Sequence, residues 1–268
     1  MIITFVSLSV VVLLIIGFLV KASMTRSRRA AMMEKRLTDA ERAALGKDFV
    51  IFLKLPEPLR DELEGLIHIF IHEKSFEACG GVEEVTDHMQ RVIAAQACLL
   101  LLNRKHDFYR KLKSILVYPS AYRVRDEHGE ESVRLGESWT SGSVILAWKS
   151  VISGGRNDQD GHDVSIHEFA HQLDQVDGAG DGVPELIGKG AYREWAVVFS
   201  QAFERFEKKL EKGKRTVIDS YGGTNSAEFF AVATETFYEK PDRLKKEYPK
   251  VYEQLCRYYM VDPSEWGS

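Results

Sequence analysis

The stretch SIHEFAHQLDQVDGAG, residues 165–180, carries His167, Glu168 and His171 in the order His-Glu-x-x-His. Residues four apart on a helix share one face, so both imidazoles can present a ring nitrogen to the same metal ion. Glu168 can reach a water on that ion and act as a general base. Apolar residues at helical spacing flank the motif, and Asp163 stands where the helix is expected to begin. The spacing predicts a helix that helps to hold one zinc ion.

A zinc ion held by two histidines needs a third protein ligand, and the sequence offers two candidates. Asp177 lies six residues after His171, at the place of the third ligand in the extended metzincin pattern. That pattern needs a glycine to turn the chain, but Asp174 occupies the turn position. Glu228, 57 residues after His171, opens an apolar helical segment, as does the third ligand of a gluzincin His₂Glu site. The residues alone leave both candidates open.

Three other acids are candidates for support of the metal ligands. Asp163 precedes His167 by one helical turn, and Asp174 follows His171 by about one turn. Either can accept a hydrogen bond from the second imidazole nitrogen and so fix the tautomer of the ligand. Glu235 follows Glu228 by two turns and is expected on the same helix face. Each of the three is equally compatible with a solvated surface acid.

Composition limits the classes of protein to which the chain can belong. The 268 residues are 44 % hydrophobic and 28 % charged, as expected of a folded globular chain with a substantial core. A formal net charge of −4 gives no reason to expect a nucleic-acid partner. The three cysteines are widely spaced, so neither a disulfide framework nor a thiolate metal site is indicated.

The amino terminus predicts a membrane anchor. Residues 2–20, IITFVSLSVVVLLIIGFLV, contain no charge, and a helix of this length reaches about 28 Å, close to the thickness of a bilayer core. The segment that follows is strongly basic, which by the positive-inside rule places it in the cytoplasm. We therefore expect a single-pass anchor over residues 1–20, a basic juxtamembrane linker over 21–46, and a cytoplasm-facing domain over 47–268.

The expected order of elements in that domain is helices, then strands, then helices. Helical periodicity runs through residues 59–71 and 86–103, and short β-branched and aromatic runs between about 114 and 148 predict a small sheet. Helices resume with the histidine motif. The fold class is therefore α+β and mostly helical, with a small sheet. The strand GSVILAW, residues 142–148, directly precedes the motif helix and is a candidate edge strand for binding an extended peptide.

Several stretches resemble known zinc peptidases. YGGTNSAEFFA, residues 221–231, is similar to a segment of the anthrax lethal factor catalytic domain in which a tyrosine seven residues before the ligand glutamate points into the active site. ILVYP, GSVILAW, DGHDVSIHEFAHQLD and AEFFAVATETF resemble the Mlc titration factor A family of glucose-regulated zinc peptidases. This resemblance, over about residues 47–260, implies a zincin-like domain that binds one Zn²⁺ through His167, His171 and Glu228. It also implies that Glu168 is the catalytic acid and base and that Tyr221 assists at the oxyanion.

Two functions from different classes follow. The first is zinc-dependent peptide hydrolysis of gluzincin type, in which Glu168 takes a proton from a zinc-activated water and Tyr221 donates a hydrogen bond to the oxyanion. The second, implied by the resemblance, is a regulatory protein that sequesters a transcriptional repressor and has weak or incidental peptidase activity. The expected partners are a peptide or protein substrate, a transcriptional regulator, and the membrane through the amino-terminal helix.

Overall fold

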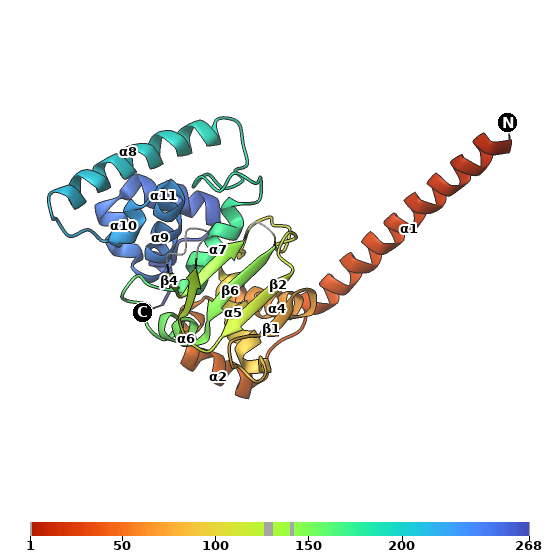
Figure 1. The fold of residues 1–268 in the computed structure, drawn as a ribbon, viewed down its shortest axis with the longest axis horizontal. Helices are drawn as coiled ribbons and strands as arrows, with labels where there is room; N and C mark the ends of the chain where they lie inside the picture. Colours follow the sequence, from red (N-terminus) through yellow and green to blue (C-terminus); the bar gives the residue numbers. More distant parts are fainter. Residues whose placement is uncertain (1, 126–130, 140–141, 268) are drawn as a thin grey trace.

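The structure is a computed structural model that describes residues 2–125, 131–139 and 142–267. A four-stranded sheet lies at the centre, and helices α8 to α11 gather on one side of it (Figure 1). The elements in chain order are α1 (Ile2–Met33), α2 (Asp39–Asp48), α3 (Ile51–Lys54), α4 (Glu57–Glu73), β1 (Ser75–Ala78), α5 (Asp87–Leu99), β2 (Ser114–Tyr118), β3 (Tyr122–Arg125), β4 (Glu131–Arg134), β5 (Gly136–Trp139), β6 (Ser143–Ala147), α6 (Trp148–Arg156), α7 (Val164–Asp174), α8 (Ala191–Glu211), the 3₁₀ helix η1 (Ser220–Gly223), α9 (Ser226–Glu239), α10 (Pro241–Glu247), α11 (Pro249–Tyr259) and the 3₁₀ helix η2 (Pro263–Glu265).

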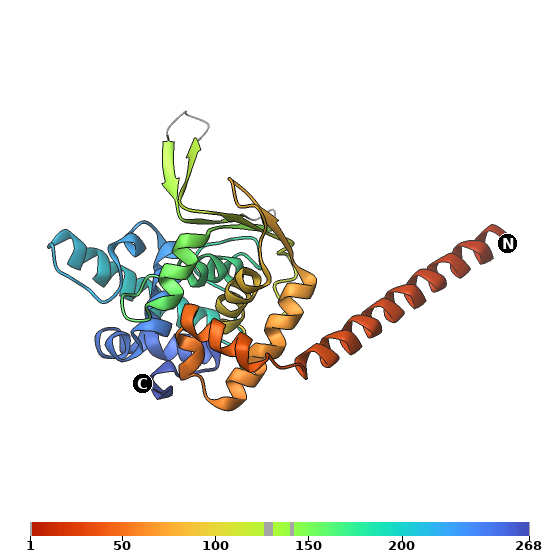
Figure 2. The ribbon, with the colours of Figure 1, turned by 90° about the horizontal axis from the view of Figure 1, so that it is seen from below.

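The order of strands in the sheet determines which strand has a free edge. Strands β1, β2 and β6 are parallel, and β5 pairs with β6 in the antiparallel direction, which gives the order β1-β2-β6-β5. The expectation that residues 142–148 form an edge strand is therefore wrong, because β6 is paired on both sides. Strand β5 is the edge strand beside the motif helix. Strands β3 and β4 form a separate ribbon that projects from the body (Figure 2).

Helix α1 corrects the expectation of a transmembrane anchor. Among the described residues, no helix has the length and apolarity that crossing a membrane requires. Lys21 and three further basic residues lie in the second half of α1. The predicted single-pass anchor, and the membrane localisation that depended on it, are wrong.

The second half of α1 is instead attached to the globular body. The Arg29 guanidinium donates two hydrogen bonds to the Glu73 carboxylate, at 2.7 and 2.8 Å, and lies 4.0 Å from the Phe108 ring centroid. Residues 21–33 thus continue α1, which extends away from the body (Figure 1), and residues 39–46 lie in α2. The division into a basic linker over residues 21–46 and a peptidase domain over 47–268 stays a prediction.

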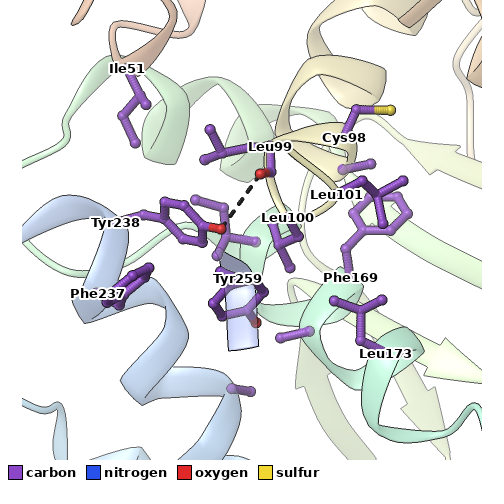
Figure 3. Packing of buried hydrophobic residues seen from close by; sticks show 14 of the residues in the cluster. Ile51, Cys98, Leu99, Leu100, Leu101, Phe169, Leu173, Phe237, Tyr238 and Tyr259 are labelled. Atoms are coloured by element: carbon purple, nitrogen blue, oxygen red, sulfur yellow. Dashed lines mark hydrogen bonds between the residues drawn. The ribbon is translucent and has the colours of Figure 1, made fainter. Parts of the chain in front are cut away.

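The expected α+β architecture, mostly helical with a small sheet, agrees with these elements. Its core lies where α5, α7, α9 and α11 meet (Figure 3). Phe169 of α7 packs there with its ring centroid 5.7 Å from Phe70 and 5.5 Å from Tyr109. Tyr238 of α9 donates a hydrogen bond to the Leu99 carbonyl at 3.5 Å. Because one face of α7 is buried in this core, the opposite face is held in a constant position.

Candidate metal centre

Helix α7 presents both motif histidines on one side. Asp163 is its N-cap, and the Asp163 carboxylate accepts hydrogen bonds from the backbone N–H groups of Ser165 (2.8 Å) and Ile166 (3.0 Å). This cap satisfies two N–H groups that the first helical turn leaves without partners. His167 and His171 then lie one turn apart, with ring centroids 4.8 Å from each other.

Helix α9 packs against α7 and brings Glu228 to the histidines. Its N-cap is Asn225, whose side-chain oxygen accepts a hydrogen bond from the Glu228 N–H at 3.0 Å. The cap places Glu228 in the first turn of α9, where the helix N-terminus favours a negative charge. Glu228 Oε2 lies 3.0 Å from His167 Nε2 and 3.4 Å from His171 Nε2.

The three side chains fit a metal ion. The two Nε2 atoms lie 3.1 Å apart, so the donor atoms form a triangle with sides of 3.0, 3.1 and 3.4 Å. Ligands about 2.0–2.1 Å from a tetrahedral zinc ion lie roughly 3.3 Å from one another. Two imidazoles and one carboxylate are a donor set that zinc accepts, and three protein ligands leave one position for water. Within the described part of the chain, this is the one group of three such side chains that converge on a point.

Asp177 lies outside this group. Its carboxylate accepts a hydrogen bond from the Ala179 N–H at 2.9 Å in the exposed turn after α7. Of the two candidates for third ligand, the structure therefore brings Glu228, and not Asp177, to the histidines.

Electrostatic coupling of the three side chains is strong. Burial alone would lower the pKa of His167, but hydrogen bonds and charges from Glu228 and Glu235 outweigh it and raise that pKa well above its ordinary value. Burial would raise the pKa of Glu228, yet the two imidazoles hold it down at about 2. Glu228 is therefore a carboxylate, the form that binds a metal.

Glu168 lies beside the triangle and is almost completely buried. Burial, opposed by the two histidines, raises the pKa of its carboxyl group to about 7. The backbone of β5 passes directly over it at Gly136, where a Cβ atom would stand 2.6 Å from Glu168 Oε1. The edge strand therefore confines the Glu168 side chain against the triangle of donor atoms from His167, His171 and Glu228, hereafter the metal triangle.

The three supporting acids play different parts. Glu235 Oε1 lies 2.8 Å from His167 Nδ1, and Glu235 Oε2 accepts a hydrogen bond from the Asp163 N–H at 2.8 Å. Asp163 caps α7 instead of contacting an imidazole. Asp174 accepts two hydrogen bonds, at 2.9 and 3.0 Å, from the N–H of Gly182 in the following loop. Of the three, Glu235 is the one that bonds to a histidine ring.

Tyr221 lies in η1 at the mouth of the site. Asp219 caps this short helix by accepting a hydrogen bond from the Tyr221 N–H at 2.8 Å. The side chain of Tyr221 is 55 % exposed, and its ring centroid lies 5.9 Å from that of His167. The phenol therefore stands near the histidines at the open side of the site.

A cleft of about 1010 Å³ opens over the metal triangle. Strand β5 forms one wall, the loop after α7 forms a second, and η1 with the start of α9 forms a third. The lining residues that the sequence did not single out include Gly136, Glu137, Ser138, His162, Asp181 and Asp219. They come from segments far apart in the chain, and of the six only His162 lies in a stretch that resembles known zinc peptidases.

Comparison with known proteins places the chain in a family. A protein of Synechocystis sp., with the printed name "Uncharacterized protein slr2042", is 40 % identical over 245 residues, which are 88 % of this chain and 89 % of that protein. Proteins named Mlc titration factor A from Yersinia pestis and Yersinia pseudotuberculosis are 28 % identical over 220 residues, 78 % of this chain and 80 % of theirs. Residues 23–260 match the family described as Glucose-regulated metallo-peptidase M90. The expected membership is confirmed, whereas the similarity to lethal factor stays a prediction: this chain belongs to the M90 family of glucose-regulated metallo-peptidases.

Proposed function

We propose that the protein hydrolyses peptide bonds with one zinc ion held by His167, His171 and Glu228. The observation that carries the proposal is the convergence of these three donors beside a buried glutamate, Glu168, at the floor of an open cleft. Bound zinc supplies a Lewis acid that lowers the pKa of a water and polarises the scissile carbonyl. The family to which the chain belongs supports the same reaction class.

The protein side chains carry the proton transfers and hold the metal ligands in place. Glu168 accepts a proton from the attacking water on its carboxylate and returns it to the leaving amine. Glu235 accepts a hydrogen bond from His167 Nδ1, which leaves Nε2 free to bind the metal. Tyr221, at the mouth of the cleft, donates its hydroxyl proton in a hydrogen bond to the oxyanion.

Strand β5 provides a place for an extended substrate. Among the described residues its backbone pairs with β6 alone, and residues 135–138 line the cleft. A peptide lying along the free edge can form main-chain hydrogen bonds with β5 and pass over the metal triangle. This mode of binding holds the peptide backbone and leaves side-chain preference to the walls of the cleft.

The test uses a Glu168→Gln protein that still binds zinc. We expect peptide hydrolysis to fall by at least about 100-fold, because a glutamine cannot accept the proton. Zinc content measured by mass spectrometry confirms that the metal site is intact. Equal rates for the variant and the parent at equal zinc content would show that Glu168 is not the base.

A second experiment tests the ligand set. We expect Glu228→Ala to lose zinc, whereas Asp177→Ala keeps it, because the Asp177 carboxylate is directed to the Ala179 N–H. Loss of zinc from the Asp177 variant with retention in the Glu228 variant would reverse the assignment.

A second candidate function is suggested by the relatives named Mlc titration factor A. In this case the chain sequesters a transcriptional regulator, and hydrolysis is incidental. Chelation of the metal distinguishes the two functions. Hydrolysis requires the ion, whereas binding of a regulator to a surface away from the cleft persists in a metal-free protein that keeps its circular dichroism spectrum. Binding that disappears with the metal would tie the partner to the peptidase site.

A further inference from the structure

The walls of the cleft are strongly acidic. Six carboxylates line it, and among the described lining residues there is neither a lysine nor an arginine. Three of the six, Glu168, Glu228 and Glu235, contact or adjoin the metal triangle. The other three are Glu137, Asp181 and Asp219.

The three outer acids occupy three different walls. Glu137 lies on β5, Asp181 lies in the loop after α7, and Asp219 caps η1. The Asp181 carboxylate accepts a hydrogen bond from the Val183 N–H at 3.2 Å, which leaves its charge intact. Asp219 Oδ2 lies 3.6 Å from His162 Nε2. Acidic side chains thus lie on more than one wall of the cleft.

A concave site with walls of one sign concentrates the electrostatic field and attracts ligands of the opposite sign. The site itself is inferred from the metal triangle and the cleft, and the acids determine which peptides enter it. Resting on the proposed peptidase function, we propose that the cleft selects peptides with lysine or arginine near the scissile bond and rejects peptides with aspartate or glutamate there. Asp181 and Asp219 are the residues that determine this specificity.

The test compares matched peptides. A peptide that the protein cleaves is chosen from a mapped digest, and residues on either side of the cut are changed in turn to lysine, glutamine or glutamate. We expect kcat/KM for the best lysine peptide to exceed that of its glutamate counterpart at least about tenfold, with glutamine between them. The ratio should shrink as salt rises from about 50 to about 500 mM, because the Debye length shortens.

Variants assign the effect to the acids. Asp181→Asn and Asp219→Asn should each reduce the lysine-to-glutamate ratio, and the double variant should reduce it further. Asp177→Asn is the matched control, because it removes a charge from the same loop at a residue outside the cleft lining. A ratio that changes as much in Asp177→Asn as in Asp181→Asn would point to overall charge and overturn the assignment.

A binding measurement separates this inference from the proposed function. Fluorescently labelled lysine and glutamate peptides are titrated with Glu168→Gln protein, and Kd is read from anisotropy. If no peptide is cleaved by the parent but the lysine peptide binds at least about tenfold more tightly at low salt, the peptidase proposal fails and the charge selection stands. If peptides of either charge are cleaved and bound equally, the peptidase proposal stands and the charge selection is wrong.

Discussion

Gly136→Ala is expected to disable catalysis while leaving the fold and the metal site in place. Gly136 lies on β5, and a Cβ atom built there would stand 2.6 Å from Glu168 Oε1, 2.7 Å from Glu168 Cγ and 2.8 Å from Val164 Cγ2. Ordinary contacts between such atoms are about 3.5–4.0 Å. One methyl group therefore competes directly with the side chain that we assign as general base.

The size of the effect follows from the overlap. The Glu168 side chain must move by about 1 Å to restore van der Waals distance to the new methyl group. A displacement of about 1 Å at a reacting group lowers the rate by about 100-fold. Because α7 is fixed from its other face by Phe169, the overlap is relieved by movement of the Glu168 and Val164 side chains and not in the core.

The assay measures kcat and KM on one peptide together with zinc content and thermal unfolding. We expect kcat to fall by about 100-fold with unchanged zinc content. Gly17→Ala is the matched control, because nothing lies within 4 Å of a Cβ at that position and its backbone is compatible with alanine. A Gly136→Ala protein with full kcat would refute the placement of Glu168 beneath β5. Loss of zinc in parallel with kcat would show that the strand supports the metal ligands instead.

Three further predictions concern two residues that support the site, Gly182 and Glu235, and one buried lysine elsewhere in the fold, Lys74. Gly182→Ala should lower the midpoint of thermal unfolding and weaken metal binding, because Gly182 has a φ of +85° and a Cβ there would collide with the Ser226 carbonyl at the start of α9; unchanged unfolding and metal titration would contradict it. Glu235→Gln should weaken zinc affinity by about 10- to 100-fold in competition with a chelator, because His167 loses the carboxylate that orients it; equal affinity would assign Glu235 no part in the site. Burial lowers the pKa of Lys74 from 10.5 to about 8. Between these pH values the unfolded chain binds more protons than the folded one, so stability rises with pH. The difference in unfolding free energy between the parent and Lys74→Met should therefore change in favour of the parent from pH 8 to pH 10, and a constant difference would exclude the effect.

The sequence by itself determined the local parts of the site. The order His-Glu-x-x-His places two ligands and a carboxylate on one helix because the helical repeat is the same in every context. Asp163 was recognisable near the start of that helix, since capping depends on residues only a few positions apart. Alternating and helical periodicities were enough for the α+β class. The prediction from the sequence was wrong at the amino terminus. A charge-free run predicted a membrane anchor there, but the described helix continues into charged residues and packs on α4.

Only the tertiary structure decided how distant segments meet. It brought Glu228 to the histidines and left Asp177 in a turn, because α9 packs against α7 across a long intervening segment. It also made β5 the edge strand instead of β6, since strand order depends on pairing partners that the pattern of one strand does not reveal. The contact of Gly136 with Glu168 and the acidic walls of the cleft have the same origin. The chain encodes the helix of the two motif histidines locally, but the approach of Glu228 and the walls of the cleft exist only after the core has packed.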